Sequence, residues 1–284
     1  MFVFASIYGI GKSVGAELIL GCRSMPKLKL LGEFKSISST RDQKVADFIE
    51  KDVLTSTILD PGLGRCCAYS TVNISVDTSS SLDLLLIDGY LQSWKYFDHW
   101  KNDLVNDLFK FKPSVIAKAD NDFHNLITSK ISNLETVPHY GCVHVRRGDY
   151  QSISSQNRGY VSSDGKTLKT AISVLNSSMI NQKKSAILLF SDDPAWCHKQ
   201  VGDKHVVVVP EQSASVAMQM MSKYCDTFFL VSSSSTFSWW AAYLSMRSAK
   251  VYYNAYFAEA GSSLANEMDK VNYFPPDWVS VSLN

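Results

Sequence analysis

The chain has 284 residues, of which 45% are hydrophobic and 19% are charged, and its formal net charge at pH 7 is +1. Such a chain folds into one large or two smaller domains, and its small net charge excludes nucleic acid or a membrane surface as a partner bound through bulk electrostatics. Any phosphate site must therefore be local. The six cysteines are too few for a disulfide scaffold and show no C-x-x-C spacing, so we expect most of them to be buried apolar residues.

Residues 1–18 have apolar and small side chains at helical spacing, which predicts a packed helix. Its glycines lack the spacing of a phosphate-binding P-loop, so we interpret them as a face for close helix packing. Because neither a strand nor a helix cap precedes this helix, we expect the natural protein to begin upstream. No apolar stretch reaches the ~20 residues that span a bilayer, and no cationic leader opens the chain.

Short apolar runs alternate with polar turns between residues 26 and 90. Residues 43–49 are expected to be helical, and Leu84–Ile87 is expected to be a buried strand. The aromatic cluster Gly89–Phe97 follows directly. Flat rings of this kind either pack in a core or line a sugar-binding cleft, and core packing is the interpretation we favour.

Asp120-Asn121-Asp122 matches the D-x-D pattern that binds a divalent cation in many sugar-nucleotide enzymes. Apolar residues at helical spacing follow it, and the helix dipole favours carboxylates in a first turn. We therefore predict a helix start and no metal site. A metal-dependent enzyme that uses UDP-sugars is the alternative. The pattern resets near Val137-Pro138, which divides the chain into an N-terminal α/β domain, 1–136, and a C-terminal domain, 137–284.

The second half predicts a parallel sheet. Its apolar runs are short and continuous, and helical patterns separate most of them, which is typical of a sheet covered on both faces. The predicted strands are Cys142–Val145, Ala186–Phe190, Val206–Val209, Thr227–Val231 and Lys250–Tyr253. The predicted helices lie near residues 168–175, 216–224 and 237–246. Ligands of such sheets bind outside the carboxyl ends of the strands.

Three of these predicted strands end in residues suited to a nucleotide. The first ends in Arg146-Arg147-Gly148-Asp149, and arginine forks bind phosphates bidentately. The second ends in Asp192-Asp193, which suit the donor edge of guanine or a ribose diol. The fourth ends in Ser232–Thr236 and leads into a helix, where hydroxyls and free N–H groups favour phosphate. Taken singly, each strand end has a purely structural explanation: an ion pair within the turn, a helix cap or a flexible loop. The three strand ends together predict a nucleoside diphosphate site.

These residues resemble a known family. His144–Asp149 is similar to the H-x-R-R-x-D motif of α-1,2-, α-1,6- and protein O-fucosyltransferases. Ser235–Leu244 resembles the N-S-[ST]-F-S-W-W-x-A-W-L block of the family 11 glycosyltransferases, the α-1,2-fucosyltransferases. Gly89–Phe97 and Met1–Ser6 also resemble this family's G-Y-F-Q-S segment and M-F-Q-Y-A helix, so the similarity extends over nearly the whole chain.

The resemblance implies a GT-B-like fold of two Rossmann-like α/β domains. The first domain would face the acceptor, and the second, with a mainly parallel sheet, would bind GDP-β-L-fucose. The implied activity is that of a galactoside 2-alpha-L-fucosyltransferase, which transfers L-fucose with inversion to the 2-hydroxyl of a galactose-terminated glycan, without a metal ion or other cofactor. Golgi members are lumenal type II membrane proteins, which implies that location and membrane attachment only through an N-terminal anchor.

Carried over residue by residue, the resemblance assigns catalysis to Arg146, His144 and Asp149. Arg146 would stabilise the β-phosphate while the glycosidic bond breaks. His144 and Arg147 would help to position the diphosphate, and Asp149 would orient an arginine. Asp192 or Asp193 would recognise guanine. The turn under the phosphates would comprise Ser234, Ser235, Thr236, Phe237 and Ser238.

The sequence departs from the family pattern in two places. Ser234 stands where the family usually has asparagine. The G-x-G-N turn that precedes the family's first helix is absent, together with the anchor and stem, so we expect this N-terminal domain to be incomplete at its start. The alternative function is therefore a degenerate member that binds nucleotide or glycan without turnover. No residue stands out as a general base.

Overall fold

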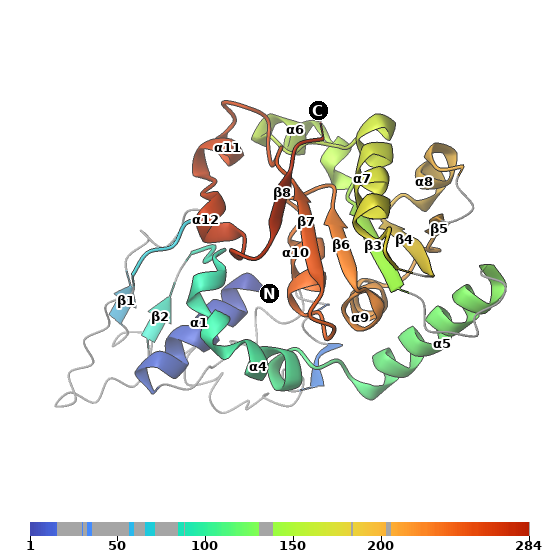
Figure 1. Cartoon of the computed structure of the whole chain (residues 1–284). Helices are drawn as coiled ribbons and strands as arrows, with labels where there is room; N and C mark the ends of the chain where they lie inside the picture. Colours follow the sequence, from blue (N-terminus) through green and yellow to red (C-terminus); the bar gives the residue numbers. More distant parts are fainter. Residues whose placement is uncertain are drawn as a thin grey trace. The chain divides into compact units, whose positions relative to one another are not determined.

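The computed structural model describes residues 1–15, 30, 33–35, 57–59, 66–71, 85–87, 89–130, 139–182, 184–202 and 206–283. The chain forms two compact units (Figure 1). One unit comprises Met1–Lys112 and Glu267–Pro275, and the other comprises Pro113–Asn266 and Pro276–Asn284. The helix predicted over residues 43–49 and the domain boundary predicted between residues 136 and 137 lie outside the described residues.

The first unit begins with α1 (Phe2–Val14), which confirms the predicted N-terminal helix. The helix ends at Gly15, whose φ of 73° is the left-handed conformation that glycine adopts most readily. A Cβ on Gly9 would collide with the carbonyl oxygen of Tyr96. Gly9 therefore allows α1 to contact the backbone of the 3-10 helix η5 (Trp94–Tyr96). This contact agrees with the prediction that the glycines of α1 form a face for close helix packing.

The remaining first-unit elements are short. Strand β1 (Thr57–Leu59) pairs in parallel with β2 (Leu85–Ile87), which confirms the strand predicted at 84–87. The helices are η6 (Asp98–Trp100), α4 (Lys101–Asp103), η7 (Leu104–Leu108) and α12 (Lys270–Tyr273). Two of the four rings in the aromatic cluster, Tyr96 and Phe97, are buried in the core, whereas Trp94 is half-buried and Tyr90 is 51% exposed.

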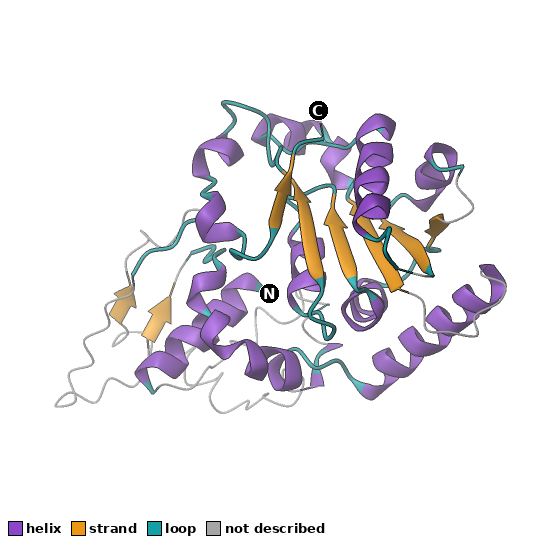
Figure 2. Ribbon diagram, viewed as in Figure 1, coloured by secondary structure: helices purple, strands orange, loops and turns teal. Residues whose placement is uncertain are grey.

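The second unit contains a six-stranded sheet in which every neighbouring pair is parallel (Figure 2). The strand order is β5-β4-β3-β6-β7-β8. The strands are β3 (His139–Val145), β4 (Ser185–Ser191), β5 (Val206–Val208), β6 (Thr227–Leu230), β7 (Lys250–Asn254) and β8 (Val279–Val281). The first five confirm the predicted strands to within a few residues. Edge strand β8 was not predicted, because three residues with a serine at the centre give no continuous apolar run.

Helices cover this sheet. They are α5 (Pro113–Lys130), α6 (Ile153–Arg158), α7 (Gly165–Ser178), α8 (Pro194–Gln200), α9 (Ala214–Tyr224), α10 (Thr236–Tyr243) and α11 (Ser263–Glu267), with the 3-10 helix η8 (Asp149–Gln151). The helices predicted near residues 168–175 and 216–224 lie wholly within α7 and α9, and most of the one predicted near 237–246 lies within α10. Helix α10 is almost wholly buried: Trp239, Trp240 and Tyr243 are each at most 1% exposed. This burial explains why its sequence is apolar on nearly every face.

The strand order places the predicted site. The chain starts this sheet at β3, proceeds outward to β4 and β5, and then crosses back to β6 on the other side of β3. This reversal makes the gap between the carboxyl ends of β3 and β6 a switch point, where open α/β sheets bind their ligands. The register aligns His144 with both Phe190 and Leu230, so the three strand ends lie together.

Asp120-Asn121-Asp122 lies in the middle of α5, so the prediction that it starts a helix is wrong. The helix begins seven positions earlier in the chain, at Pro113, whose fixed φ suits a first helical turn. Asp120 accepts hydrogen bonds from Lys223 Nζ at 2.7 Å and Tyr224 Oη at 2.6 Å. Across the described residues there is no group of three or more His, Cys, Asp or Glu side chains arranged to hold a metal ion.

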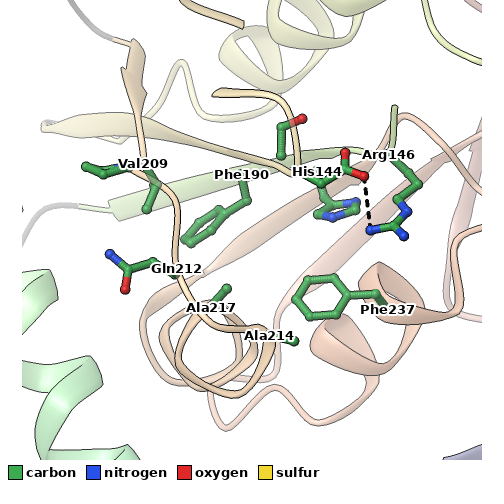
Figure 3. Close-up of a pocket in the computed structure, with 11 residues that line it drawn as sticks. His144, Arg146, Phe190, Val209, Gln212, Ala214, Ala217 and Phe237 are labelled. Atoms are coloured by element: carbon green, nitrogen blue, oxygen red, sulfur yellow. Dashed lines mark ion pairs between the residues drawn. The ribbon is translucent and has the colours of Figure 1, made fainter. Parts of the chain in front are cut away.

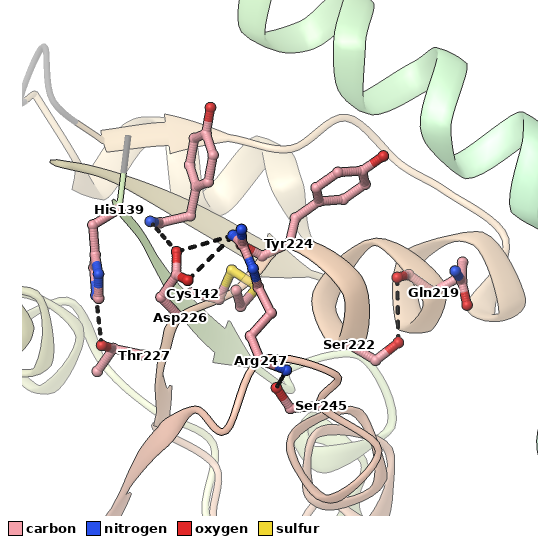
Figure 4. Close-up of a disulfide and its surroundings, with 11 residues drawn as sticks. His139, Cys142, Gln219, Ser222, Tyr224, Asp226, Thr227, Ser245 and Arg247 are labelled. Carbon is pink, nitrogen blue, oxygen red and sulfur yellow. Dashed lines mark hydrogen bonds and ion pairs between the residues drawn. A yellow bond between two sulfur atoms is a disulfide. The ribbon is translucent and has the colours of Figure 1, made fainter. Parts of the chain in front are cut away.

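A buried disulfide joins Cys142 in β3 to Cys225, the residue after α9 (Figure 4). The neighbouring Asp226 accepts a hydrogen bond from Tyr140 N at 2.9 Å and forms an ion pair with Arg247 at 3.2 Å. The strand that carries the arginine motif is thus tied covalently to the segment that enters β6. Cys66 and Cys67 are also bonded to each other, whereas Cys197 is free and buried.

None of the helices in the described part of the chain combines the length and the hydrophobicity required to cross a bilayer.

The Cys142–Cys225 disulfide should contribute strongly to the stability of the second unit. The two cysteines are 83 positions apart, so the bond restricts a long loop of the unfolded chain. We expect Cys142→Ser/Cys225→Ser to lower the free energy of unfolding by about 2–5 kcal/mol, measured by urea denaturation followed through tryptophan fluorescence.

The matched control is Cys66→Ser/Cys67→Ser, which removes a bond between adjacent residues that closes no long loop. Its unfolding transition should shift much less. Equal shifts in the two double variants would contradict the loop-restriction argument.

Candidate active site

A pocket of about 130 Å³ lies at the carboxyl ends of β3 and β4 in the second unit. Figure 3 shows the rings of Phe190, His144 and Phe237 around it, with Arg146 beside His144. Pro210 and Ala217 add apolar walls from the segment after β5 and from α9. A cavity that combines apolar walls with several convergent polar groups is typical of a small-molecule site.

Arg146 is held at the rim by two carboxylates. Its Nε donates to Asp149 Oδ1 at 2.7 Å, and its Nη1 lies 3.0 Å from Asp192 Oδ2. Its backbone N–H donates to Ser232 Oγ at 3.0 Å, which fixes the turn after β3 against the turn after β6. About a third of the guanidinium side chain remains exposed, so the charge is positioned while some of its donors face solvent. Asp149 therefore lies where it can orient this arginine.

Asp192 anchors the turn after β3. Its Oδ1 accepts the Arg147 N–H at 2.8 Å, and its Oδ2 accepts the Gly148 N–H at 3.0 Å. A Cβ at position 148 would lie only 2.6 Å from Asp192 Oδ2, so this close approach requires glycine. Each carboxylate oxygen can accept two hydrogen bonds, and Oδ2 also pairs with Arg146 Nη1, so one lone pair, on Oδ1, remains free in a residue that lines the pocket.

Arg147 and Asp193 are turned away from the pocket, and neither lines it. The Arg147 guanidinium stacks 3.7 Å from the Trp196 ring centroid and donates to the Ser163 carbonyl at 2.8 Å. Asp193 accepts from Arg147 Nε at 3.3 Å and caps α8 through the Trp196 N–H at 3.0 Å. The helix-cap explanation of Asp193 is therefore the one that the structure shows.

His144 is a buried, neutral imidazole that lines the pocket. Its pKa is lowered from 6.5 to about 4, chiefly by burial; the nearby Asp192 carboxylate opposes this shift, and the Arg146 charge adds to it. Its ring lies 5.1 Å from the Phe237 ring, and its Nδ1 has no hydrogen-bond partner. A buried ring nitrogen without a partner is an unused donor or acceptor beside the pocket.

The serine turn, which we define as Ser232–Ser235, connects β6 to α10. Ser232 Oγ also donates to the Arg146 carbonyl at 3.2 Å, and Ser234 Oγ lies 3.1 Å from Tyr150 Oη in a buried hydrogen bond. Ser235 stands at the N-cap of α10 without a side-chain cap bond, so the first N–H groups of this helix have no side-chain cap. Tyr150, directly after the arginine motif, is a supporting residue that no sequence pattern indicated.

The predicted turn residues divide into two groups. Phe237 lines the pocket, and Thr236 is exposed in the first turn of α10. Ser238 is fully buried and donates to the Ser235 carbonyl at 3.1 Å, so its hydroxyl serves the helix rather than the pocket. The structure thus brings His144, Arg146, Asp149 and Asp192 together with Phe237, and places Arg147, Asp193 and Ser238 in supporting positions.

The model of the family described as "Glycosyl transferase family 11" matches residues 79–282, which include the whole site. The chain belongs to glycosyl transferase family 11. This membership confirms the family indicated by the sequence motifs. The two α/β units, and the parallel sheet of the second unit, agree with the expected α/β, GT-B-like fold class.

Known relatives carry fucosyltransferase names. The chain is 28% identical to a galactoside 2-alpha-L-fucosyltransferase of Caenorhabditis elegans, over 78% of the chain and 59% of the relative. It is 26% identical to a galactoside 2-alpha-L-fucosyltransferase of Bos taurus, over 70% of the chain and 52% of the relative. The chain thus spans little more than half the length of these two relatives.

A solved structure, the beta Kdo 2,7 transferase KpsC of Thermosulfurimonas dismutans, matches 92% of this chain and 85% of its own chain. The identity is 13% and the TM-score is 0.27, which is too low to assign a fold.

The buried His144 predicts a pH dependence of stability. Because its pKa is lower in the folded state, the unfolded chain takes up a proton first as the pH falls below 6.5. The stabilisation is therefore complete above pH 6.5 and is lost as the pH falls toward 4. Between pH 7 and pH 4.5 we expect wild type to lose about 2–3 kcal/mol more than His144→Gln, measured by urea denaturation.

His198, which is in α8, provides the control. The variant His198→Gln should show the same loss between the two pH values as wild type. An identical pH dependence in His144→Gln and wild type would show that His144 is not the buried neutral group described above.

Proposed function

We propose that this protein is an enzyme that transfers L-fucose from GDP-β-L-fucose to the 2-hydroxyl of a terminal galactoside. The observation that carries the proposal is the Arg146 guanidinium, held by Asp149 and Asp192 at the switch point of the sheet beside the pocket. Such a fixed cation suits a diphosphate leaving group. Family membership and the names of the relatives support fucosyl transfer.

In this proposal the guanine base occupies the pocket between Phe190 and Phe237, because flat apolar walls suit a purine ring. Asp192 is the candidate for recognising a guanine N–H group, since it lines the pocket and Oδ1 retains one free lone pair. His144 is kept neutral by burial and offers Nδ1 to the bound nucleotide. Arg147 and Asp193 support the site by fixing the turn and capping α8 rather than by touching the donor.

The transfer itself would proceed with inversion. The bond between the fucose anomeric carbon and the β-phosphate oxygen breaks, and GDP leaves with its electron pair. The galactoside 2-hydroxyl oxygen bonds to that carbon and releases its proton to water. Negative charge grows on the leaving phosphate, where Arg146 and the uncapped N–H groups at the start of α10 would stabilise it. The reacting sugar carries positive charge in such a transition state, so a strong base for the hydroxyl is not required.

We also propose that the reaction needs no metal ion and takes place in the Golgi lumen. Arg146 and a helix N-terminus supply the positive charge that a metal ion would otherwise provide. The buried Cys142–Cys225 disulfide fits an oxidising compartment, since such bonds are rare in the cytosol. EDTA should therefore leave the transfer rate unchanged, and loss of activity in EDTA would contradict the metal-independent mechanism.

Arg146→Ala should lower kcat for fucosyl transfer by about 10²–10³-fold, because it removes one preorganised donor from the developing negative charge. Arg146→Lys should retain part of the activity, since it keeps the charge but loses the planar fork. The assay is transfer from GDP-[14C]fucose to a galactoside, with thermal unfolding measured in parallel.

Arg247→Ala is the matched control, because Arg247 pairs with Asp226 beyond the opposite end of β6. It should leave kcat nearly unchanged. If Arg146→Ala unfolded the protein, its role would be structural. Transfer by wild type would exclude the degenerate, non-catalytic alternative, whereas binding of UDP but not GDP in calorimetric titration would overturn the proposed donor.

A further inference from the structure

A second pocket, of about 160 Å³, lies within the second unit at the carboxyl ends of β6 and β7. We call it the Ser233 pocket. Its walls come from the loop before α7, from the serine turn and from the segment after β7, and it shares no lining residue with the pocket at His144. The proposed function assigns no role to this pocket.

The polar groups of the Ser233 pocket are almost all neutral. They include the hydroxyls of Ser162, Thr167 and Ser233 and the amide of Asn254. Asp164 is the one charged residue that lines it, and its carboxylate accepts the Thr167 N–H at 2.7 Å. Hydrogen bonds from Thr167 lower the Asp164 pKa, so the carboxylate is ionised. With one negative charge and no lysine or arginine in its lining, the pocket disfavours phosphates and acidic sugars.

Aromatic rings complete the wall. Tyr256 and Phe257 both line the pocket, and rings of this kind pack against the apolar face of a sugar. Asn254 fixes their position, since its Nδ2 donates to the Val231 carbonyl at 3.3 Å and its Oδ1 accepts the Tyr256 N–H at 3.0 Å. Neutral hydrogen-bonding groups beside aromatic rings form a surface that suits a neutral, hydroxylated ring.

The hydroxyl of Ser233 leaves one hydrogen-bonding group of the pocket unused. The Ser233 side chain is 1% exposed, and its Oγ has no hydrogen-bond partner. Both neighbouring hydroxyls are satisfied: Ser232 bonds to the backbone of Arg146, and Ser234 bonds to Tyr150. A buried hydroxyl without a partner costs free energy, which a ligand hydroxyl in this pocket would recover.

We propose that the Ser233 pocket binds one neutral hexose unit. Ser232 connects it directly to the turn of Arg146, so a sugar there would lie beside the proposed diphosphate position. The inference rests on the proposed function, because that function identifies the molecules that would supply the sugar. The hexose is either the fucosyl group of the donor or the galactosyl unit of the acceptor, and the chemistry of the pocket suits both.

The test compares Ser233→Ala with wild type in calorimetric titrations with GDP, GDP-fucose and methyl β-galactoside. Removing a hydroxyl that has no partner should not lower the melting temperature. We expect GDP to bind equally to both proteins. The sugar ligand should bind about 2–10-fold more weakly to the variant, which is the effect of one lost hydrogen bond.

A second variant, Ser162→Trp, places a bulky ring in the pocket from a half-buried position and should abolish the sugar-dependent part of binding. Ser173→Ala, at an exposed position of α7 outside the pocket, is the matched control and should behave as wild type. A weaker GDP-fucose affinity at unchanged GDP affinity would assign the pocket to the donor sugar. A weaker galactoside affinity would assign it to the acceptor.

Unchanged affinities for both sugar ligands in Ser233→Ala and Ser162→Trp would overturn the inference. An equal loss of GDP and GDP-fucose affinity would overturn it too, because the effect would then act through the phosphate-binding turn. Failure of the proposed function looks different: wild type itself would bind neither GDP nor GDP-fucose, and the galactoside titration alone would then decide whether the pocket binds a hexose.

Discussion

The site depends on the Asp192 carboxylate. It accepts the backbone N–H groups of Arg147 and Gly148 and pairs with the Arg146 guanidinium, so one side chain directly after β4 shapes the turn after β3 and also orients its cation. The arrangement requires glycine at position 148, because any Cβ there would press against the carboxylate. Asp192 thereby fixes the turn so that Arg146 lines the pocket.

Two turns from separate strands act as one unit around Arg146. Ser232 binds both the N–H and the carbonyl of Arg146, and Tyr150 binds Ser234 across the same gap. The disulfide between Cys142 and Cys225 holds the same two strands together near their other end. Strands fixed at both ends keep the arginine and the start of α10 at a constant separation, which is what electrostatic stabilisation of a leaving diphosphate requires.

The sequence motifs indicated the residues but not their orientation. His144, Arg146, Asp149, Asp192 and Phe237 were all predicted, and they lie together. Arg147 and Asp193 were also predicted to contact the donor, yet Arg147 stacks on Trp196 and Asp193 caps α8. A motif records that two arginines are adjacent, whereas adjacent residues beyond a strand end project in different directions. Trp196 and Ser163, which are not next to the motif in the sequence, bind Arg147 and so keep it out of the pocket.

The sequence by itself determined the parallel sheet of the second unit and the family, because continuous apolar strands and two dense motifs are local patterns. It could not determine where Asp120-Asn121-Asp122 lies in its helix, since the Lys223 and Tyr224 that bind Asp120 come from α9. Nor could it reveal the Cys142–Cys225 disulfide or the Ser233 pocket. Cys142 and Cys225 are 83 positions apart, and the Ser233 pocket joins residues 161–167 to residues 231–257, so both features exist only once the chain is folded.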